Sequence, residues 1–190
     1  MKPLAEALAP WQNFYTLTGT ASATLVGLLF VAASVSTGVF TGERRAPMRV
    51  FLTASVVNFS LVLATSLILM APVRDWTWLG AMIIGCGVFG LGYSCLAVRD
   101  CARDGLLPRI DLEDRTWYIA GPIIGYLALA GSGVAFVERL DPACLALAAS
   151  MGLLLAVGIH NAWDITLWSM ARRRQGSPPP APPGKPPPAP

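Results

Sequence analysis

Five long stretches of the chain carry almost no charge, and they constrain the fold more than any other feature. A helix rising 1.5 Å per residue needs about 20 apolar residues to cross a hydrocarbon core ~30 Å thick. Every stretch reaches that length, and none alternates in polarity as the ~10-residue strands of a membrane barrel do. We therefore predict an all-α, polytopic membrane protein with five transmembrane helices. The predicted spans are about 14–40, 49–71, 76–98, 116–137 and 143–170.

The composition agrees with one transmembrane domain covering residues 1–174. Hydrophobic residues make up 54% of the chain and charged residues 13%, against about 25% charged in soluble domains. The first apolar stretch is much longer than the 7–15-residue core of a cleaved signal peptide, and Glu6 offsets Lys2 before it. We expect it to remain in the protein as the first span.

Residues 175–190 have a different composition, with nine prolines among them. Proline lacks the backbone N–H that a helix needs, so we predict a disordered cytoplasmic tail of polyproline II type. Such a segment is able to bind an aromatic-lined groove. A tail without a binding partner is the simpler interpretation of composition alone.

The basic residues predict the orientation. Three of the fourteen Lys and Arg lie at the N-terminus and in the second and fourth connections, and eleven lie in the first and third connections and the tail. Because basic residues stay in the cytoplasm, we predict a periplasmic N-terminus and a cytoplasmic C-terminus. This imbalance argues against insertion in both orientations. Interfacial tryptophans agree, with Trp11, Trp76 and Trp78 at outer ends and Trp117 and Trp168 at inner ends.

Several classes of function lack support. The only GxGxxG, at residues 85–90, lies within a predicted span rather than after a strand, so it does not indicate a dinucleotide site. Residues 99–115 mix four Arg with five acidic residues, which excludes a strong nucleic-acid surface. One histidine and four cysteines without a CxxC spacing indicate no metal site. We assign no catalytic residue and no cofactor.

Small residues at four-residue spacing mark faces where helices approach closely in lipid. The first span carries Gly19, Ala23 and Gly27, and the fourth carries Gly121 and Gly125. These rows predict helix packing, either within the chain or between copies.

Polar residues inside two spans are the candidate functional site. His160 and Asp164 are spaced i, i+4 and share a helix face, which also carries Gly152, Ala156 and Trp168. We expect this face to turn inward, with Asn161 beside it and Asn58 of the second span at a similar depth. The favoured role of this cluster is a hydrogen-bonded lock that fixes helix register; an ion or ligand site and catalysis are the alternatives.

The first span reads FYTLTGTASATLVGLLFVAASVS, and the last contains HNAWD. Residues 11–36 and 158–168 resemble small bacterial multi-span inner-membrane proteins with a GLLFVA-type first helix. The resemblance implies a location in the bacterial inner membrane.

Together these features lead us to expect a non-enzymatic inner-membrane subunit or regulator that acts through helix–helix contacts with a membrane partner or with itself. The alternatives are a small oligomeric ion or proton channel or transporter that uses Asn58, His160 and Asp164, and an intramembrane enzyme.

Overall fold

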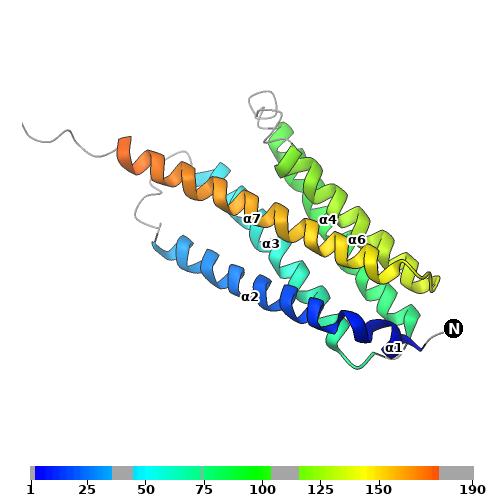
Figure 1. Ribbon diagram of the computed structural model, residues 1–190. Coiled ribbons are helices and arrows are strands. Elements are labelled where there is room, and N and C mark those ends of the chain that lie inside the picture. The colour runs from blue at the N-terminus through cyan, green and yellow to red at the C-terminus, as the bar shows by residue number, and fades with distance from the viewer. Residues whose placement is uncertain (1–2, 36–44, 74, 104–115, 176–190) are drawn as a thin grey trace, which may run out of the picture.

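The protein is built from helices that run back and forth between two ends (Figure 1). The computed structural model describes residues 3–35, 45–73, 75–103 and 116–175, of which 35, 45–52, 101 and 165–175 are described by backbone alone. Its helices are α1 (Leu4–Leu8), η1 (Ala9–Trp11), α2 (Gln12–Val35), α3 (Arg45–Met70), α4 (Trp76–Arg103), η4 (Thr116–Ala120), α6 (Gly121–Val137) and α7 (Ala143–Gln175).

The prediction of an all-α chain with five helices able to cross a membrane is confirmed. Among the described residues there is no strand, and five helical segments are long and apolar enough to span. The first of these begins at Leu4, ten residues before the predicted span, because α1 and η1 continue into α2. Residues 36–40 of the predicted first span, and residues 176–190 of the predicted tail, lie outside the described residues.

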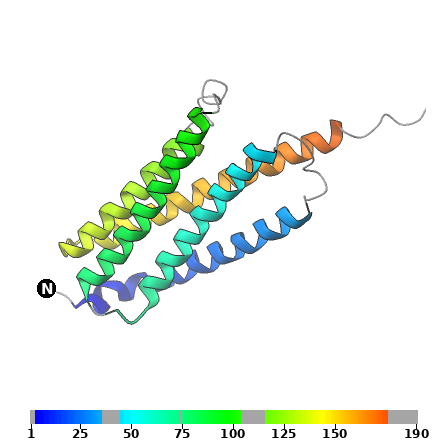
Figure 2. The ribbon, with the colours of Figure 1, turned by 180° about the vertical axis from the view of Figure 1, so that it is seen from behind.

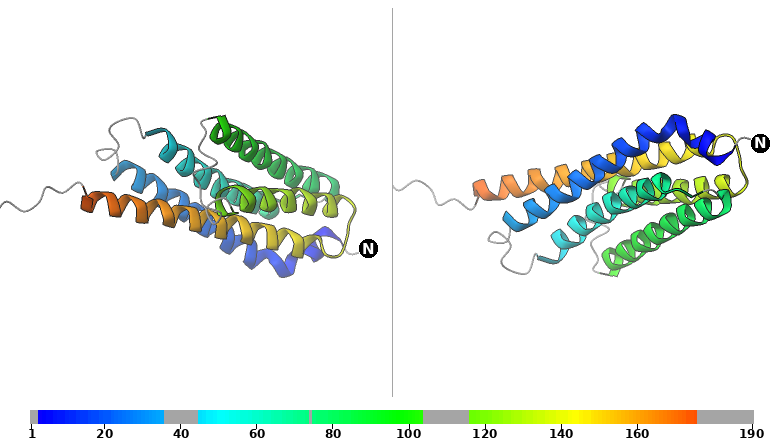
Figure 3. Two further views of the ribbon diagram at one scale, coloured as in Figure 1. Left: turned by 90° about the horizontal axis from the view of Figure 1, so that it is seen from above. Right: turned by 90° about the horizontal axis from the view of Figure 1, so that it is seen from below.

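The five long helices form two groups. Helices α2, α3 and α7 pack together, and α4 and α6 form a pair that contacts them through α3 and α7. The N-terminus, the α3–α4 connection and the α6–α7 turn all lie at one end, which we call the N-terminal end (Figure 1). From there the α4–α6 pair diverges from α2 and α7 toward the opposite end (Figures 2 and 3).

Helices α4 and α6 touch backbone to backbone. A Cβ atom added to Gly80 would lie 2.6 Å from the carbonyl oxygen of Gly133, and one added to Gly87 would lie 2.6 Å from the backbone nitrogen of Ala130. One added to Gly90 would lie 2.2 Å from the ring of Tyr126. In lipid, such close approach at small residues is what holds helices together.

The predicted packing residues divide into two kinds. Gly121 and Gly125 of α6 lie against Val157 and Leu154 of α7, and Gly19 of α2 lies against Ser66 of α3. Ala23 and Gly27 instead face out of the bundle, and nothing lies within 4 Å of a Cβ added to Gly27. The buried stripe of α2 runs elsewhere, through Tyr15, Thr18, Gly19, Ser22 and Leu29.

Short-range contacts fix the N-terminal end. Asp75 caps α4 by accepting hydrogen bonds from the backbone N–H groups of Thr77 and Trp78, at 2.7 and 3.2 Å. The N–H of Trp78, more than that of Thr77, holds the pKa of the Asp75 carboxyl below its ordinary value.

Helix α6 ends in a Schellman turn, in which the N–H of Leu140 bonds to the carbonyl of Ala135 and that of Arg139 to Phe136. Arg139 occupies the left-handed position with φ of 55°, where a non-glycine residue costs roughly 1–2 kcal/mol.

The α4–α6 contact yields a matched pair of substitutions on one helix. Gly87→Ala places a methyl group against the backbone of Ala130, and we expect a loss of about 1–3 kcal/mol, as for other overpacked sites. Gly85 faces open space, so Gly85→Ala should be neutral or stabilising by up to about 1 kcal/mol through helix propensity. Unfolding in mixed micelles measures both, and equal effects would contradict the backbone contact.

Candidate functional site

The candidate site is organised by an unusual turn at the start of the fourth span. Residues Thr116–Ala120 form η4, one turn of π-helix, directly before α6. Pro122 follows, and its ring lacks an N–H and crowds the carbonyl four residues earlier, that of Tyr118. Widening of the preceding turn relieves this conflict. Trp117 and Tyr118 on the widened turn both reach α7.

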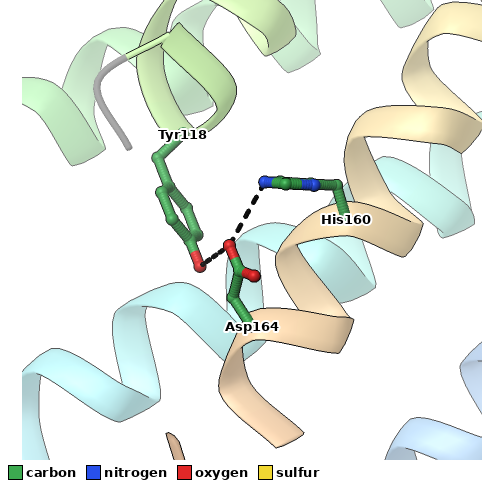
Figure 4. Close-up of polar contacts among 3 residues, drawn as sticks. All are labelled: Tyr118, His160 and Asp164. Carbon is green, nitrogen blue, oxygen red and sulfur yellow. Dashed lines mark hydrogen bonds and ion pairs between the residues drawn. The ribbon is translucent and has the colours of Figure 1, made fainter. Parts of the chain in front are cut away.

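The first part of the site joins η4 to α7 and consists of Trp117, Tyr118, His160 and Asp164. Figure 4 shows one carboxylate oxygen of Asp164 between the other two polar groups. The hydroxyl of Tyr118 donates to Oδ2 at 3.3 Å, and Nε2 of His160 lies 3.2 Å from the same atom. The indole of Trp117 stacks on the imidazole with ring centroids 4.3 Å apart. Four side chains from two elements thus hold each other in place.

The second part of the site lies deeper, where α3, α6 and α7 meet. The hydroxyl of Tyr126 donates to Oδ1 of Asn58 at 2.5 Å. Asn58 is 3% exposed and Asn161 is 1% exposed. Nδ2 of Asn58 and Oδ1 of Asn161 are buried and have no hydrogen-bond partner.

Those two atoms are a donor and an acceptor on helices that pack together. Gly158 of α7 contacts Phe59 of α3, Asn58 is next to Phe59, and Asn161 is one turn from Gly158. The two helices run in opposite directions (Figure 1), so the turn of α7 after Gly158 runs alongside the turn of α3 before Phe59. An unpaired amide is costly in a nonpolar interior. Pairing of the two atoms with each other would remove this cost.

The four polar residues expected to share one buried cluster occupy two settings. Asn58 and Asn161 lie in the core, whereas the side chains of His160 and Asp164 are 31% and 33% exposed. The row expected to turn inward is instead at the margin: Ala156 is exposed, and nothing lies within 4 Å of a Cβ added to Gly152. The side chain of Trp168 lies outside the described residues.

Helical geometry explains the difference. A row at four-residue spacing advances about 400° per step and so drifts by ~40° around the helix. Over five positions it leaves the core face. The buried stripe of α7 follows mixed spacings of three and four, typical of a packed helix, through Leu147, Met151, Leu154, Val157 and Asn161.

Sequence reasoning missed the residues that the fourth span contributes. The sequence pattern indicates Trp117 only as an interfacial ring and gives no role to Tyr118 or Tyr126. A usable signal was present, because a tyrosine hydroxyl within a membrane span needs a partner, and these two tyrosines lie eight residues apart on one helix.

The arrangement is suited to holding helices or passing protons more than to binding a metal. Among the described residues, no group of three or more His, Cys, Asp and Glu is placed to hold a metal ion. Tyr118, Asp164 and His160 are linked through one carboxylate oxygen, and the side chains of Asp164 and His160 are about one third exposed.

A double-mutant cycle tests the contact between the two amides. If Asn58 and Asn161 pair, the effects of Asn58→Ala and Asn161→Ala on unfolding free energy should be non-additive by about 0.6 kcal/mol and seldom above ~1.7. Thr18→Ala serves as control, because Thr18 contacts Ser66, eight residues or ~12 Å along α3 from Asn58. Asn58→Ala and Thr18→Ala should be additive. Additivity of the two asparagine substitutions would refute the pairing.

The contacts of Asp164 with Tyr118 and His160 either hold the helices together or transfer protons, and Asp164→Asn distinguishes the two roles. Asparagine keeps an oxygen that accepts from Tyr118 and His160, so a lock predicts nearly unchanged stability, whereas Asp164→Leu should lose about 1–2 kcal/mol. Unfolding in mixed micelles measures this. Asparagine does not titrate, so a proton relay predicts that Asp164→Asn abolishes proton flux in liposomes while the protein stays folded. We expect Asp164→Asn to be as stable as the wild type and to have no effect on proton flux. Loss of a wild-type proton flux in the folded variant would contradict the structural role.

The chain matches no protein-family model, and no curated protein or solved structure is significantly similar to it. We therefore infer its function from the contacts described above.

Proposed function

We propose that the chain is a non-enzymatic integral membrane protein that acts through helix–helix contacts made by the outward face of α2. One observation carries this proposal. Four small residues at the spacing of a packing face, Thr20, Ala23, Thr24 and Gly27, are all exposed. We call them the α2 stripe.

The α2 stripe lies on the side of the helix opposite its buried residues. Taking 100° per residue, its centre is about 140° from the centre of the stripe through Thr18, Gly19 and Ser22. Large apolar side chains flank it, including Leu28 at 59% exposed and Phe30 at 63%. A shallow strip between bulky residues is the shape that lets a second helix approach closely in lipid.

The polar atoms of the stripe do not oppose burial. The hydroxyl of Thr20 donates to the carbonyl of Thr16 at 2.8 Å, and that of Thr24 to Thr20 at 2.9 Å. Both hydroxyls therefore keep a partner when another helix covers them. A second helix would add dispersion contacts without leaving a donor unsatisfied.

We infer that the second helix is α2 of another copy. A two-fold contact requires a surface complementary to itself, and a narrow strip of small residues meets this requirement because neither helix projects a long side chain into the other. Copies inserted in the same orientation would pack α2 against α2 in parallel.

We further propose that the protein lies in the bacterial inner membrane, with its N-terminal end in the periplasm and its C-terminus in the cytoplasm. The distribution of Lys and Arg supports this orientation, and the resemblance of the first and last spans to bacterial multi-span proteins supports the location. The proline-rich tail would then extend into the cytoplasm.

Proton or ion transfer along the margin of α7 is the second candidate. It is favoured by one observation, the shared oxygen of Asp164 that links Tyr118 and His160 at a partly exposed position. It ranks second because the deeper polar residues, Asn58 and Asn161, carry amides that do not titrate.

A pair of glycine substitutions tests self-association. Gly27 and Gly92 are both exposed on spanning helices with nothing within 4 Å of an added Cβ. We expect the wild type to be dimeric in nanodiscs and Gly27→Ile to weaken the dimer by about tenfold or more, equivalent to ~1.4 kcal/mol. Gly92→Ile should leave it intact. Mass photometry measures the state, and a monomeric wild type would overturn the proposal.

A further inference from the structure

A cavity of about 450 Å³ opens at the N-terminal end of the bundle. Its walls come from three parts of the chain: η1 contributes Trp11, the start of α4 contributes Trp76, and the α6–α7 turn with the start of α7 contributes Arg139, Asp141 and Cys144. The volume lies within the range of small-molecule sites, which is roughly 300–1,000 Å³.

The aromatic walls are held by internal ring contacts. Trp11 packs edge-on against Phe14, with centroids 6.2 Å apart, and stacks with Tyr15 at 6.5 Å. Trp76 packs against Phe136 at 5.9 Å. The thiol of Cys144 points to the carbonyl of Ala7 at 3.8 Å and joins α7 to α1. The cavity is therefore built by packing that exists without a ligand.

Two opposite charges, two positions apart in sequence, line this cavity. Arg139 supplies a guanidinium, whose planar fork of donors suits phosphate, and Asp141 supplies a carboxylate that suits an ammonium group. An ammonium is also attracted to the faces of indole rings. A ligand with both an ammonium and a phosphate would meet every type of group in the wall.

The backbone at Arg139 gives a second reason to assign a role to its side chain. Its φ of 55° is a conformation that glycine adopts without strain and arginine does not. Arginine at this position is unfavourable for the turn itself, and strained residues occur preferentially at binding sites.

We propose that this cavity binds a zwitterion of the phosphoethanolamine type, with its phosphate at Arg139 and its ammonium between Asp141 and the two indoles. The headgroup of a phospholipid is the nearest source. Trp76 begins one span, and Trp11 lies seven residues after the start of another. Tryptophan prefers the level where lipid headgroups meet the hydrocarbon core. The same chemistry is also offered by free phosphoethanolamine.

Native mass spectrometry of the full, delipidated chain tests the assignment. The probes are phosphatidylethanolamine and phosphatidylglycerol with identical acyl chains, which differ in the ammonium group. We expect the first to be retained about tenfold better than the second. Free phosphoethanolamine, followed by thermal unfolding in detergent, distinguishes the sources: protection by the free compound equal to that by the lipid assigns a soluble ligand, and protection by the lipid alone assigns the headgroup.

Arg139→Gly is the informative variant, because it removes the charge and relieves the backbone. It should raise the unfolding temperature while lowering the retention of both lipids, because both carry the phosphate that we assign to Arg139. Arg139→Lys should keep most of the binding, and Asp141→Asn should remove the preference between the lipids. Arg103→Gln, at the other end of α4, is the control for loss of one positive charge. Equal retention of both lipids by the wild type, or unchanged retention by Arg139→Gly, would overturn the proposal.

Discussion

Close approach of helix backbones at glycine is the contact on which the rest of the structure depends. Lipid is as apolar as the side chains of these helices, so covering one leucine with another adds little. Backbone contact at Gly80 and Gly87 and ring contact at Gly90 instead fix α6 on α4. At Gly90 the missing side chain is replaced by the ring of Tyr126, whose hydroxyl reaches Asn58 on α3. A glycine on one helix thereby positions a hydrogen bond between two others.

Among the polar residues of the candidate site, the amides and the ionisable side chains occupy different positions. Amides need partners but never carry charge, and Asn58 and Asn161 occupy the core. Asp164 and His160 can be charged, and they lie at the margin with a tyrosine and a tryptophan against them. Ionisable side chains within a span are expected to turn inward, and these two do so only in part, because about one third of each side chain is exposed.

The sequence predicted the number and approximate limits of the spans because length and lack of charge are properties of consecutive residues. It predicted poorly which side of each helix turns toward the core, because a helix that is apolar all round shows no difference between its core side and its lipid side. Gly121 and Gly125 contact α7, while Ala23 and Gly27, at the same spacing, face out. Only the positions of the neighbouring helices distinguish these cases.

Two local turns position side chains of the candidate sites, and the search for apolar spans does not detect such turns. The strained φ at Arg139 and the π-turn before Pro122 both arise from contacts over four or five residues. Each positions side chains far apart in sequence, Arg139 beside Trp11 and Tyr118 beside Asp164. Their roles depend on which distant segment lies opposite, so the pattern of residues alone did not reveal them.

The two ends of the bundle are stabilised in different ways, and this gives the margin contacts their importance. The N-terminal end is tied by the Asp75 cap, the Schellman turn at Arg139 and the packing of α1. Toward the other end the α4–α6 pair diverges from α7 (Figure 2), so rotation about the fixed end would separate them most there. The bond between Tyr118 and Asp164 joins the two groups on this diverging side. This hydrogen bond adds to the packing of Gly121 and Gly125 against α7 in holding the two groups together.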